Sequence, residues 1–180
     1  MKFKFLFFLP AFLLMANQST AQTTNVFING VELSLTQTQS VEQYYRVKIQ
    51  KGRYWYDSTC GLWGLEGEGV TGLILPNLNL GGQLKSNASK GRTGLFINGR
   101  QVNRKELLQW KGLLGTVNLG RYWMDAYGNV GFEGGAYLFN VVQLQNRNRS
   151  QNSFWRSTTT GIGTGGSGSS FYVIGKDFSY

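Results

Sequence analysis

The side chains that could do chemistry in this sequence gather in two short stretches that repeat one another. The first stretch reads GRYWYD, Gly52 to Asp57, and is followed by GLWGLEG, Gly61 to Gly67. The second reads GRYWMD, Gly120 to Asp125, and is followed by GNVGFEG, Gly128 to Gly134. Each stretch combines an arginine, a tryptophan and two carboxylates. Such a set could stack on a sugar ring and bind its hydroxyl groups, or supply the carboxylate pair of a glycoside hydrolase.

The composition excludes many other chemistries. The 180 residues include no histidine and a single cysteine, Cys60. Without histidine, the Ser-His-Asp and Cys-His nucleophile systems are absent in their usual form, and so is the commonest general base near neutral pH. One cysteine and no histidine leave no tetrahedral zinc site, and no acidic stretch has the spacing of a calcium loop. We therefore assign no catalytic residue, no metal site and no cofactor.

The two stretches belong to a longer repeat that covers most of the chain. VFINGVEL, Val26 to Leu33, matches LFINGRQV, Leu95 to Val102. The distance between matching residues falls from 69 in this segment to 68 at the GRYW stretch and 67 at the final glutamate. Two copies of one pattern at such a constant distance are hard to obtain by chance, so we expect two structurally related units.

Each unit is expected to begin with a strand and a tight turn, because the Asn-Gly of FING favours a two-residue hairpin loop. In the second unit a helix follows, with Asn103 as its N-cap and Glu106 completing a capping box. The predicted apolar face of this helix consists of Leu107, Leu108, Trp110 and Leu114. The corresponding first segment, residues 34–49, fits a helix or a strand. GRYW-D then forms a strand that pairs with G--G-EG as a β-hairpin.

The remaining segments complete a β-rich α+β fold. The connector between the units contains Pro76 and many glycines, and it starts with a short strand at Leu73 to Leu75. After the second hairpin, Ala136 to Gln145 has the character of a strand or a short helix. The predicted organisation is a signal peptide at 1–21, a first unit at 22–72, a connector at 73–94, a second unit at 95–145, a polar Gly/Ser linker at 146–170 and a terminal strand-like segment at 171–180.

The first residues predict export. Lys2 and Lys4 precede an apolar run from Phe5 to Met15, which has the length of a signal-peptide core and is too short to span a bilayer. Small residues at the last and third-last positions of the leader predict cleavage after Ala21. No later apolar run is long enough to cross a membrane. We therefore expect a secreted protein of the periplasm, cell surface or extracellular space, without a transmembrane segment.

The chain carries a basic bias on a polar surface. Its net charge is +9, although charged residues make up only 15% of the sequence. Such a bias suits anionic polysaccharide or a membrane surface, or it serves solubility alone. Nucleic acid is not an expected partner for an exported protein. Cys60 lies in a predicted turn, where it could be exposed and pair between chains, although a lone cysteine is more often incidental.

Strand alternation assigns the aromatic residues of GRYWYD to two faces. The tyrosines point to one face, and Arg53, Trp55 and Asp57 point to the other. In one interpretation the second face is structural, because an arginine that stacks on an indole and is held by a carboxylate caps the core of each unit. In the other interpretation it is a platform for sugar rings, and two linked weak sites gain avidity. The platform requires Trp55 and Trp123 to be at least partly exposed.

Three motifs carry a resemblance to known proteins: Phe96 to Arg100, Gly120 to Asp125 and Phe132 to Gly135. They resemble a group of uncharacterised secreted bacterial proteins with tandem units of the form NGR-L…GRYW-D--G--G-EGG. The resemblance covers most of Val26 to Gly135 and implies export and a repeated structure. The aromatic hairpins are also similar to those of cell-wall and glucan-binding repeats.

Taken together, these features predict a secreted, non-enzymatic protein that binds polysaccharide or cell-surface glycan through its aromatic hairpins. One alternative is a structural or protein-partner module of a surface, biofilm or secretion assembly. A carboxylate-based glycan hydrolase is the other alternative. The candidate ligand-binding residues are Arg53, Trp55, Asp57, Trp63, Glu66, Arg121, Trp123, Asp125 and Glu133.

Overall fold

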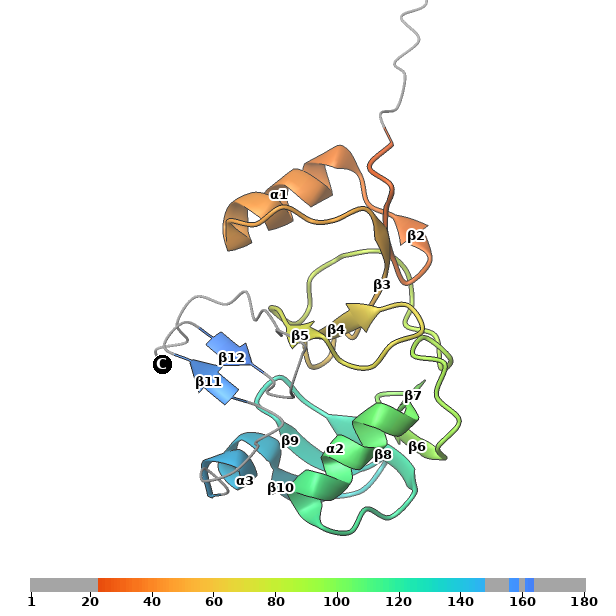
Figure 1. Cartoon of the computed structure of the whole chain (residues 1–180), viewed down its shortest axis with the longest axis vertical. Helices are drawn as coiled ribbons and strands as arrows, with labels where there is room; N and C mark the ends of the chain where they lie inside the picture. Colours follow the sequence, from red (N-terminus) through yellow and green to blue (C-terminus); the bar gives the residue numbers. More distant parts are fainter. Residues whose placement is uncertain (1–22, 148–155, 159–160, 164–180) are drawn as a thin grey trace, which may run out of the picture.

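The computed structural model describes residues 23–147, 156–158 and 161–163, and Figure 1 shows how they are arranged. The elements of the first unit are β1 (Val26–Ile28), β2 (Val31–Glu32), α1 (Leu35–Tyr45), β3 (Gly52–Tyr56), β4 (Leu62–Leu65) and β5 (Gly72–Leu73). Those of the second unit are β6 (Leu95–Ile97), β7 (Arg100–Gln101), α2 (Arg104–Leu114), β8 (Gly120–Met124), β9 (Asn129–Phe132), β10 (Tyr137–Asn140) and α3 (Val141–Arg147). A last pair, β11 (Arg156–Thr158) and β12 (Gly161–Gly163), is antiparallel.

The two units have the same topology. Each forms a five-stranded sheet, ordered β2-β1-β3-β4-β5 in the first unit and β7-β6-β8-β9-β10 in the second. In each sheet one parallel pair, β1 with β3 or β6 with β8, is joined by a helical crossover, and the other pairs are antiparallel. The predicted β-rich α+β fold of two related units is thereby confirmed.

The Asn-Gly turns fix the start of each unit. Asn98 and Gly99 have φ angles of 48° and 82°, the left-handed pair that a two-residue hairpin loop requires. The Asn98 side chain also binds both backbone groups of Met124, with its Nδ2 donating to the carbonyl and its Oδ1 accepting from the amide, each at 2.8 Å. Asn29 binds the two backbone groups of Tyr56 in the same way. Asparagine is therefore needed both for the turn and for tying the turn to the following hairpin.

The second helix begins where the sequence predicts, and the first segment, for which the sequence allowed a helix or a strand, is also helical. The first segment resolves as α1, capped by a reciprocal pair of hydrogen bonds between Ser34 and Gln37. Asn103 caps α2 by accepting from the backbone N–H of Glu106. The predicted apolar face of α2 is partly wrong, because Leu108 is 59% exposed whereas Glu106, Trp110 and Leu113 are buried. The Glu106 side chain does not complete the predicted capping box, because it binds Arg100.

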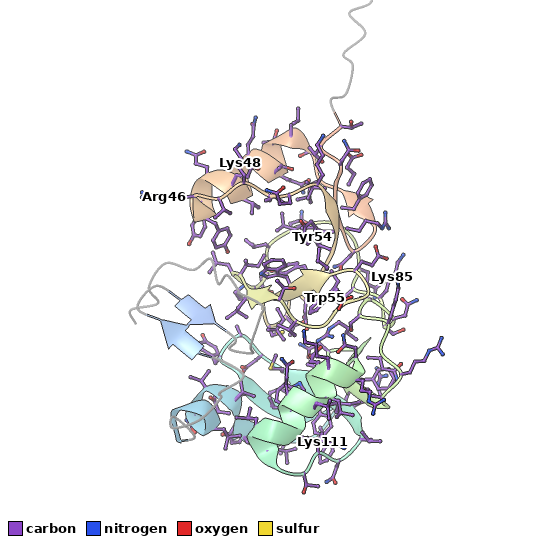
Figure 2. The ribbon with its side chains drawn as sticks, viewed as in Figure 1. Arg46, Lys48, Tyr54, Trp55, Lys85 and Lys111 are labelled. Carbon is purple, nitrogen blue, oxygen red and sulfur yellow. The ribbon has the colours of Figure 1, made fainter. Side chains whose placement is uncertain are left out.

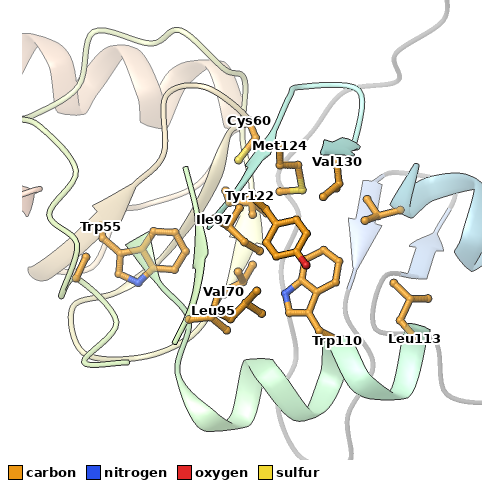
Figure 3. Packing of buried hydrophobic residues seen from close by; sticks show 14 residues of the cluster. Trp55, Cys60, Val70, Leu95, Ile97, Trp110, Leu113, Tyr122, Met124 and Val130 are labelled. Carbon is orange, nitrogen blue, oxygen red and sulfur yellow. The ribbon is translucent and has the colours of Figure 1, made fainter. Parts of the chain in front are cut away.

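The first sheet is buried on both of its faces. On the side of α1, its core contains Val26, Ile28, Leu33, Tyr56 and Leu80. The opposite face contributes Trp55, Cys60, Leu62 and Val70 to a larger core that continues into the second unit. Figure 3 shows Cys60 and Val70 of the first unit close to Met124, Ile97 and Leu95 of the second, with the Trp55 indole to one side of them. The second unit therefore packs on the outer face of the first sheet, and Trp55 and Asp57 of the predicted Arg-Trp-Asp face lie in an internal joint, whereas Arg53 stays exposed.

The segments around the units differ in detail from their predictions. The short strand expected at Leu73 to Leu75 is β5, and the stretch 136–145 forms both a strand, β10, and the start of a helix, α3. The predicted Gly/Ser linker includes β11 and β12. The predicted signal peptide and terminal segment lie outside the described residues, and the unit boundaries stay predictions. No helix in the described part of the chain is long and apolar enough to cross a membrane.

Cys60 is buried rather than exposed, with 2% of its surface accessible, and it is a free thiol. Its turn lies under the second unit, and its Sγ donates to Oδ2 of Asp57 at 3.2 Å. Burial, reinforced by the Asp57 carboxylate, raises the pKa of the Cys60 thiol well above its usual value. The thiol is therefore a poor nucleophile and is not placed to pair between chains.

We expect Gly64→Ala to destabilise the protein by about 1–3 kcal/mol, because it overpacks the hairpin under Trp55. A Cβ at Gly64 would lie 2.3 Å from the Gly69 carbonyl oxygen and 2.8 Å from an indole carbon of Trp55. The matched control is Gly112→Ala in α2, where a Cβ would have no neighbour within 4 Å. The control should stabilise the protein by about 0.5–1 kcal/mol through helix propensity. Denaturant unfolding measures both, and equal effects would contradict the close packing at Gly64.

Candidate functional site

Trp55 lies at the centre of the joint between the two units. Its indole is 1% exposed, and its Nε1 donates to the Glu68 carbonyl at 3.0 Å. One side of the ring lies over Gly64, and the guanidinium of Arg100 lies 4.0 Å from the ring centroid. Figure 2 places Trp55 below β4, toward the second unit. The prediction that Trp55 is partly exposed is therefore wrong, because the second unit covers it.

The arginine over Trp55 belongs to a buried ion pair that sequence reasoning missed. Arg100 and Glu106 have side chains that are each 1% exposed. Their two hydrogen bonds, Nη1 to Oε2 and Nη2 to Oε1, measure 2.9 and 2.8 Å, and Nη1 also donates to Ser89 Oγ at 2.7 Å. Burial alone lowers the pKa of Arg100, but the contact with Glu106 outweighs it and raises the pKa above its usual value. The sequence signal was that only the second FING copy is followed by arginine.

Asp57 is also used inside the joint. It is 3% exposed, and its Oδ2 accepts from Asn98 Nδ2 at 2.8 Å, across the boundary between the units. Its Oδ1 accepts from the backbone N–H of Thr59 at 2.9 Å. Asp57 therefore orders a turn and ties the units together. It is buried, whereas Glu66 is exposed and paired with an arginine, so the two do not form the predicted pair of accessible carboxylates.

Arg53 and Arg121 form equivalent exposed clusters, one on each unit. Arg53 Nε lies 2.5 Å from Glu66 Oε2, and its guanidinium lies 5.1 Å from the Phe27 ring centroid. Arg121 pairs with Glu133 in the same way and lies 5.0 Å from the ring centroid of Phe96. Each arginine is thus held by a carboxylate and stacked on an aromatic ring, but the ring is a phenylalanine of the neighbouring parallel strand and not the predicted indole.

The exposed pair of the second unit has the expected electrostatics. The hydrogen bond from Arg121 lowers the pKa of Glu133, and the bond to Glu133 raises the pKa of Arg121. Both groups are solvent-exposed, so the pair contributes little to stability. Among the described residues, no group of three or more His, Cys, Asp or Glu side chains is placed to hold a metal ion.

Trp123 occupies the position of Trp55 in the second unit but is only half-buried. Its indole lies over Gly131, and its Nε1 donates to the Gly135 carbonyl at 3.1 Å, as in the first unit. Asp125 is satisfied locally, because it accepts from the backbone N–H of Tyr127 and from both nitrogens of Asn129. Asn129 stands where the first unit has the buried Leu62. The outer face of the second unit therefore keeps its tryptophan but has a polar side chain in place of the buried leucine.

Trp63 lies on the opposite face of the first sheet from Trp55. It packs against Tyr54 in an edge-to-face arrangement with ring centroids 6.0 Å apart. The matching residue of the second unit is Val130, opposite Met124 in the β8–β9 register as Trp63 is opposite Tyr56. A valine cannot fill the space of an indole. The nine predicted site residues are thus divided between two faces and two units, and they do not form one site.

An apolar groove of about 350 Å³ lies in the second unit, on the face that carries Val130. It runs between the inner face of the sheet and the C-terminal half of α2 with the loop that follows. Its lining includes Leu95, Ile97, Trp110, Leu114, Tyr122, Val130, Phe132 and Leu138. Phe132 and Leu138 are 43% and 46% exposed, and Leu119 near the same loop is 59% exposed. Sequence reasoning missed this groove, although the exchange of Trp63 for Val130 between the copies indicated it.

Two curated proteins are similar to this chain. Extra-large guanine nucleotide-binding protein 1 of Arabidopsis thaliana is 39% identical over 124 residues, which cover 66% of this chain and 14% of that protein. Extra-large guanine nucleotide-binding protein 2 of the same plant is 37% identical over 89 residues, which cover 48% of this chain and 10% of that protein. The chain therefore spans a small part of either relative. No protein-family model matches it, and no solved structure does.

These relatives correct the functional predictions made from sequence. The related proteins are plant guanine nucleotide-binding proteins, so the resemblance to secreted bacterial repeat proteins is wrong. The predictions of glycan binding, of a surface, biofilm or secretion role, of a polysaccharide partner and of secretion are contradicted by the same finding. The physical reason is visible in the joint: indole, guanidinium and carboxylate groups that suit a sugar ring suit equally well the packing of one unit on another.

Proposed function

We propose that this chain is a protein-docking module that binds a guanine nucleotide-binding partner through the apolar groove of its second unit. The similarity to part of two guanine nucleotide-binding proteins supports the class of partner. The groove is the observation that carries the docking role, because it is an apolar hollow with exposed apolar residues at its rim. Such residues mark interaction surfaces, where a partner side chain fills the hollow and excludes water.

In this proposal the nucleotide belongs to the partner. The phosphate loop of P-loop proteins has the pattern G-x-x-x-x-G-K-S/T, in which the glycine-lysine pair precedes a hydroxyl residue. The sequence contains a single Gly-Lys dipeptide, Gly175-Lys176, and Asp177 follows it. The sheets described above are also mainly antiparallel, whereas the P-loop joins a strand to a helix in a parallel sheet. The fold therefore favours a role beside the nucleotide site.

The first unit explains why the groove is specific to the second. There the equivalent space is occupied by Trp63 and by the connector, whose Leu75 binds two tyrosine hydroxyls. Tyr56 Oη donates to the Leu75 carbonyl at 2.6 Å, and the Leu75 N–H donates to Tyr45 Oη at 2.8 Å. The second unit has Met124 and Leu114 at the two tyrosine positions, so those anchoring hydroxyls are absent. One unit is thus closed by its own chain, while the other keeps a surface that a partner can fill.

The test uses extra-large guanine nucleotide-binding protein 1 of Arabidopsis thaliana, from which the segment that matches this chain has been deleted. This protein is immobilised with bound GDP, and the whole chain described here is the soluble ligand. We expect saturable binding that Val130→Trp weakens at least tenfold, because the indole refills the groove as Trp63 does in the first unit. Leu138→Asp should weaken binding similarly. Because Leu138 lies at the exposed rim of the groove, this change does not require the core to accommodate a larger side chain. Leu108→Ser, on an exposed part of α2 that does not line the groove, is the matched control and should bind normally.

Two results would reject the proposed function. One is the absence of binding between the wild-type chain and the deleted relative. The other is tight binding of GTP or GDP to the chain alone in a calorimetric titration, because the nucleotide site would then belong to this chain. Circular dichroism and thermal unfolding of each variant must match the wild type, so that lost binding is not lost folding.

A further inference from the structure

The joint between the units is a template for a second docking site. In that joint the second unit presents an Asn-Gly-Arg turn to the outer face of the first sheet. Arg100 stacks on Trp55 with its guanidinium 4.0 Å from the ring centroid, and Asn98 donates to Asp57. Trp55 is otherwise held by its own hairpin, through Gly64 beneath the ring and the bond from Nε1 to Glu68. The surface of the first unit that receives the turn is thus the Trp55 indole, which has a glycine on one side and a guanidinium on the other.

The second unit carries the same receiving surface one step further along the repeat. Trp123 lies over Gly131, and its Nε1 bonds to the Gly135 carbonyl. The structure describes no third unit on this face, and Trp123 is half-buried where Trp55 is fully buried. We propose that the outer face of Trp123 binds an arginine-bearing β-turn of another polypeptide, in the way that Trp55 binds Arg100. The physical basis is cation–π stacking on a preorganised indole.

The surroundings of Trp123 suit an interface that forms and dissociates. Around Trp55 the outer face has Cys60, Leu62 and Val70, all buried, which is the composition of a permanent core. Around Trp123 the corresponding strands carry Asp125, Asn129 and Asn140 in a hydrogen-bonded network: Asn129 Nδ2 donates to Asp125 and Asn140 Nδ2 donates to Asn129 Oδ1, each at 2.8 Å. A face that is satisfied by its own hydrogen bonds tolerates water, as the rims of reversible interfaces do.

The occupant is a different polypeptide rather than a second copy of this chain. The only exposed equivalent of the Asn98–Arg100 turn within the described units is Asn29–Val31, which ends in valine. That turn is also engaged already, because Asn29 Nδ2 donates to the Gly82 carbonyl of the connector at 2.9 Å. It therefore offers no guanidinium to Trp123 of a neighbouring molecule.

The experiment follows the indole N–H signals of the ¹⁵N-labelled full chain during titration with a cyclised hairpin peptide that reproduces Leu95 to Gln101. We expect the Trp123 signal to shift saturably, and the Trp55 signal, which is buried in the joint, to stay in place. A peptide with leucine in place of its arginine should bind about fivefold more weakly or worse, as expected for loss of a cation–π contact. Trp123→Ala should abolish the saturable binding while the remaining signals stay at their native positions.

Three outcomes would overturn the assignment. They are an unshifted Trp123 signal, equal binding of the arginine and leucine peptides, and a Trp123 shift that depends on protein concentration without peptide, which would make a second copy the occupant. The Val130→Trp variant separates this inference from the proposed function. Because Val130 faces the groove on the other side of the sheet, that variant should bind the peptide as the wild type does.

Discussion

Glu106→Gln is expected to lower the free energy of unfolding by about 3–5 kcal/mol, because it removes one charge of a buried ion pair and leaves the other charge without its partner. Arg100 remains charged under all ordinary conditions, because a guanidinium does not lose its proton in proteins. Its side chain is 1% exposed, so water cannot replace the lost carboxylate. Trp55 covers its other side. The variant therefore leaves a charge enclosed between two units, and chemical denaturation followed by circular dichroism should show the loss directly.

The double variant Arg100→Leu with Glu106→Leu is the informative control. Removing both charges should restore much of the stability, since apolar side chains of similar volume often replace a buried pair without net cost. Arg104→Gln, an exposed change on the same helix, should alter stability by no more than about 0.5 kcal/mol. If Glu106→Gln costs less than about 1 kcal/mol, the pair is open to water and the joint is looser than described.

The second large effect is an asymmetry between the two equivalent tryptophans. Trp55→Ala should destabilise the protein by about 3–5 kcal/mol, because it empties the middle of a core shared by both units. Trp123→Ala should cost only about 1–2 kcal/mol, because its ring is half-buried and not enclosed by a second unit. The same pair of variants can be measured by thermal or denaturant unfolding under identical conditions.

The comparison is sharp because the two residues share their local geometry. Each lies over a glycine of the partner strand and donates its Nε1 to a backbone carbonyl of the same hairpin. If the two substitutions differ by more than about 1 kcal/mol in the free energy of unfolding, the difference must then come from the second unit, which covers Trp55. Equal costs would show that the stacking of units contributes little, and would also weaken the use of the joint as a template for docking at Trp123.

The consequence for function is that the two halves of a duplicated chain have diverged in opposite directions. In the first unit, Trp63 and the connector fill one face, and the second unit covers Trp55 on the other. The second unit keeps an apolar groove on one face and a half-buried indole on the other. We therefore place both proposed docking surfaces on the second unit.

The sequence misassigned function through a specific ambiguity. Arginine, tryptophan and aspartate on one face of a strand predicted either a sugar platform or a structural cap. The structure uses the groups for packing, but with exchanged partners: Arg53 stacks on Phe27, and Trp55 receives Arg100 from the other unit. Nothing in a stretch of six residues indicates which distant arginine will reach its indole. The relatives then removed the secreted, glycan-binding interpretation altogether.

By itself the sequence determined the duplication, the Asn-Gly turns, the start of the second helix at Asn103 and the two-faced hairpins. These features depend on backbone preferences and on side-chain alternation over a few residues, so they can be read locally. The tertiary structure alone decided which tryptophan is buried, where Glu106 finds its partner and where a groove remains. Those outcomes arise when one unit packs on the other, and the free energy of that packing depends on residues far apart in the chain.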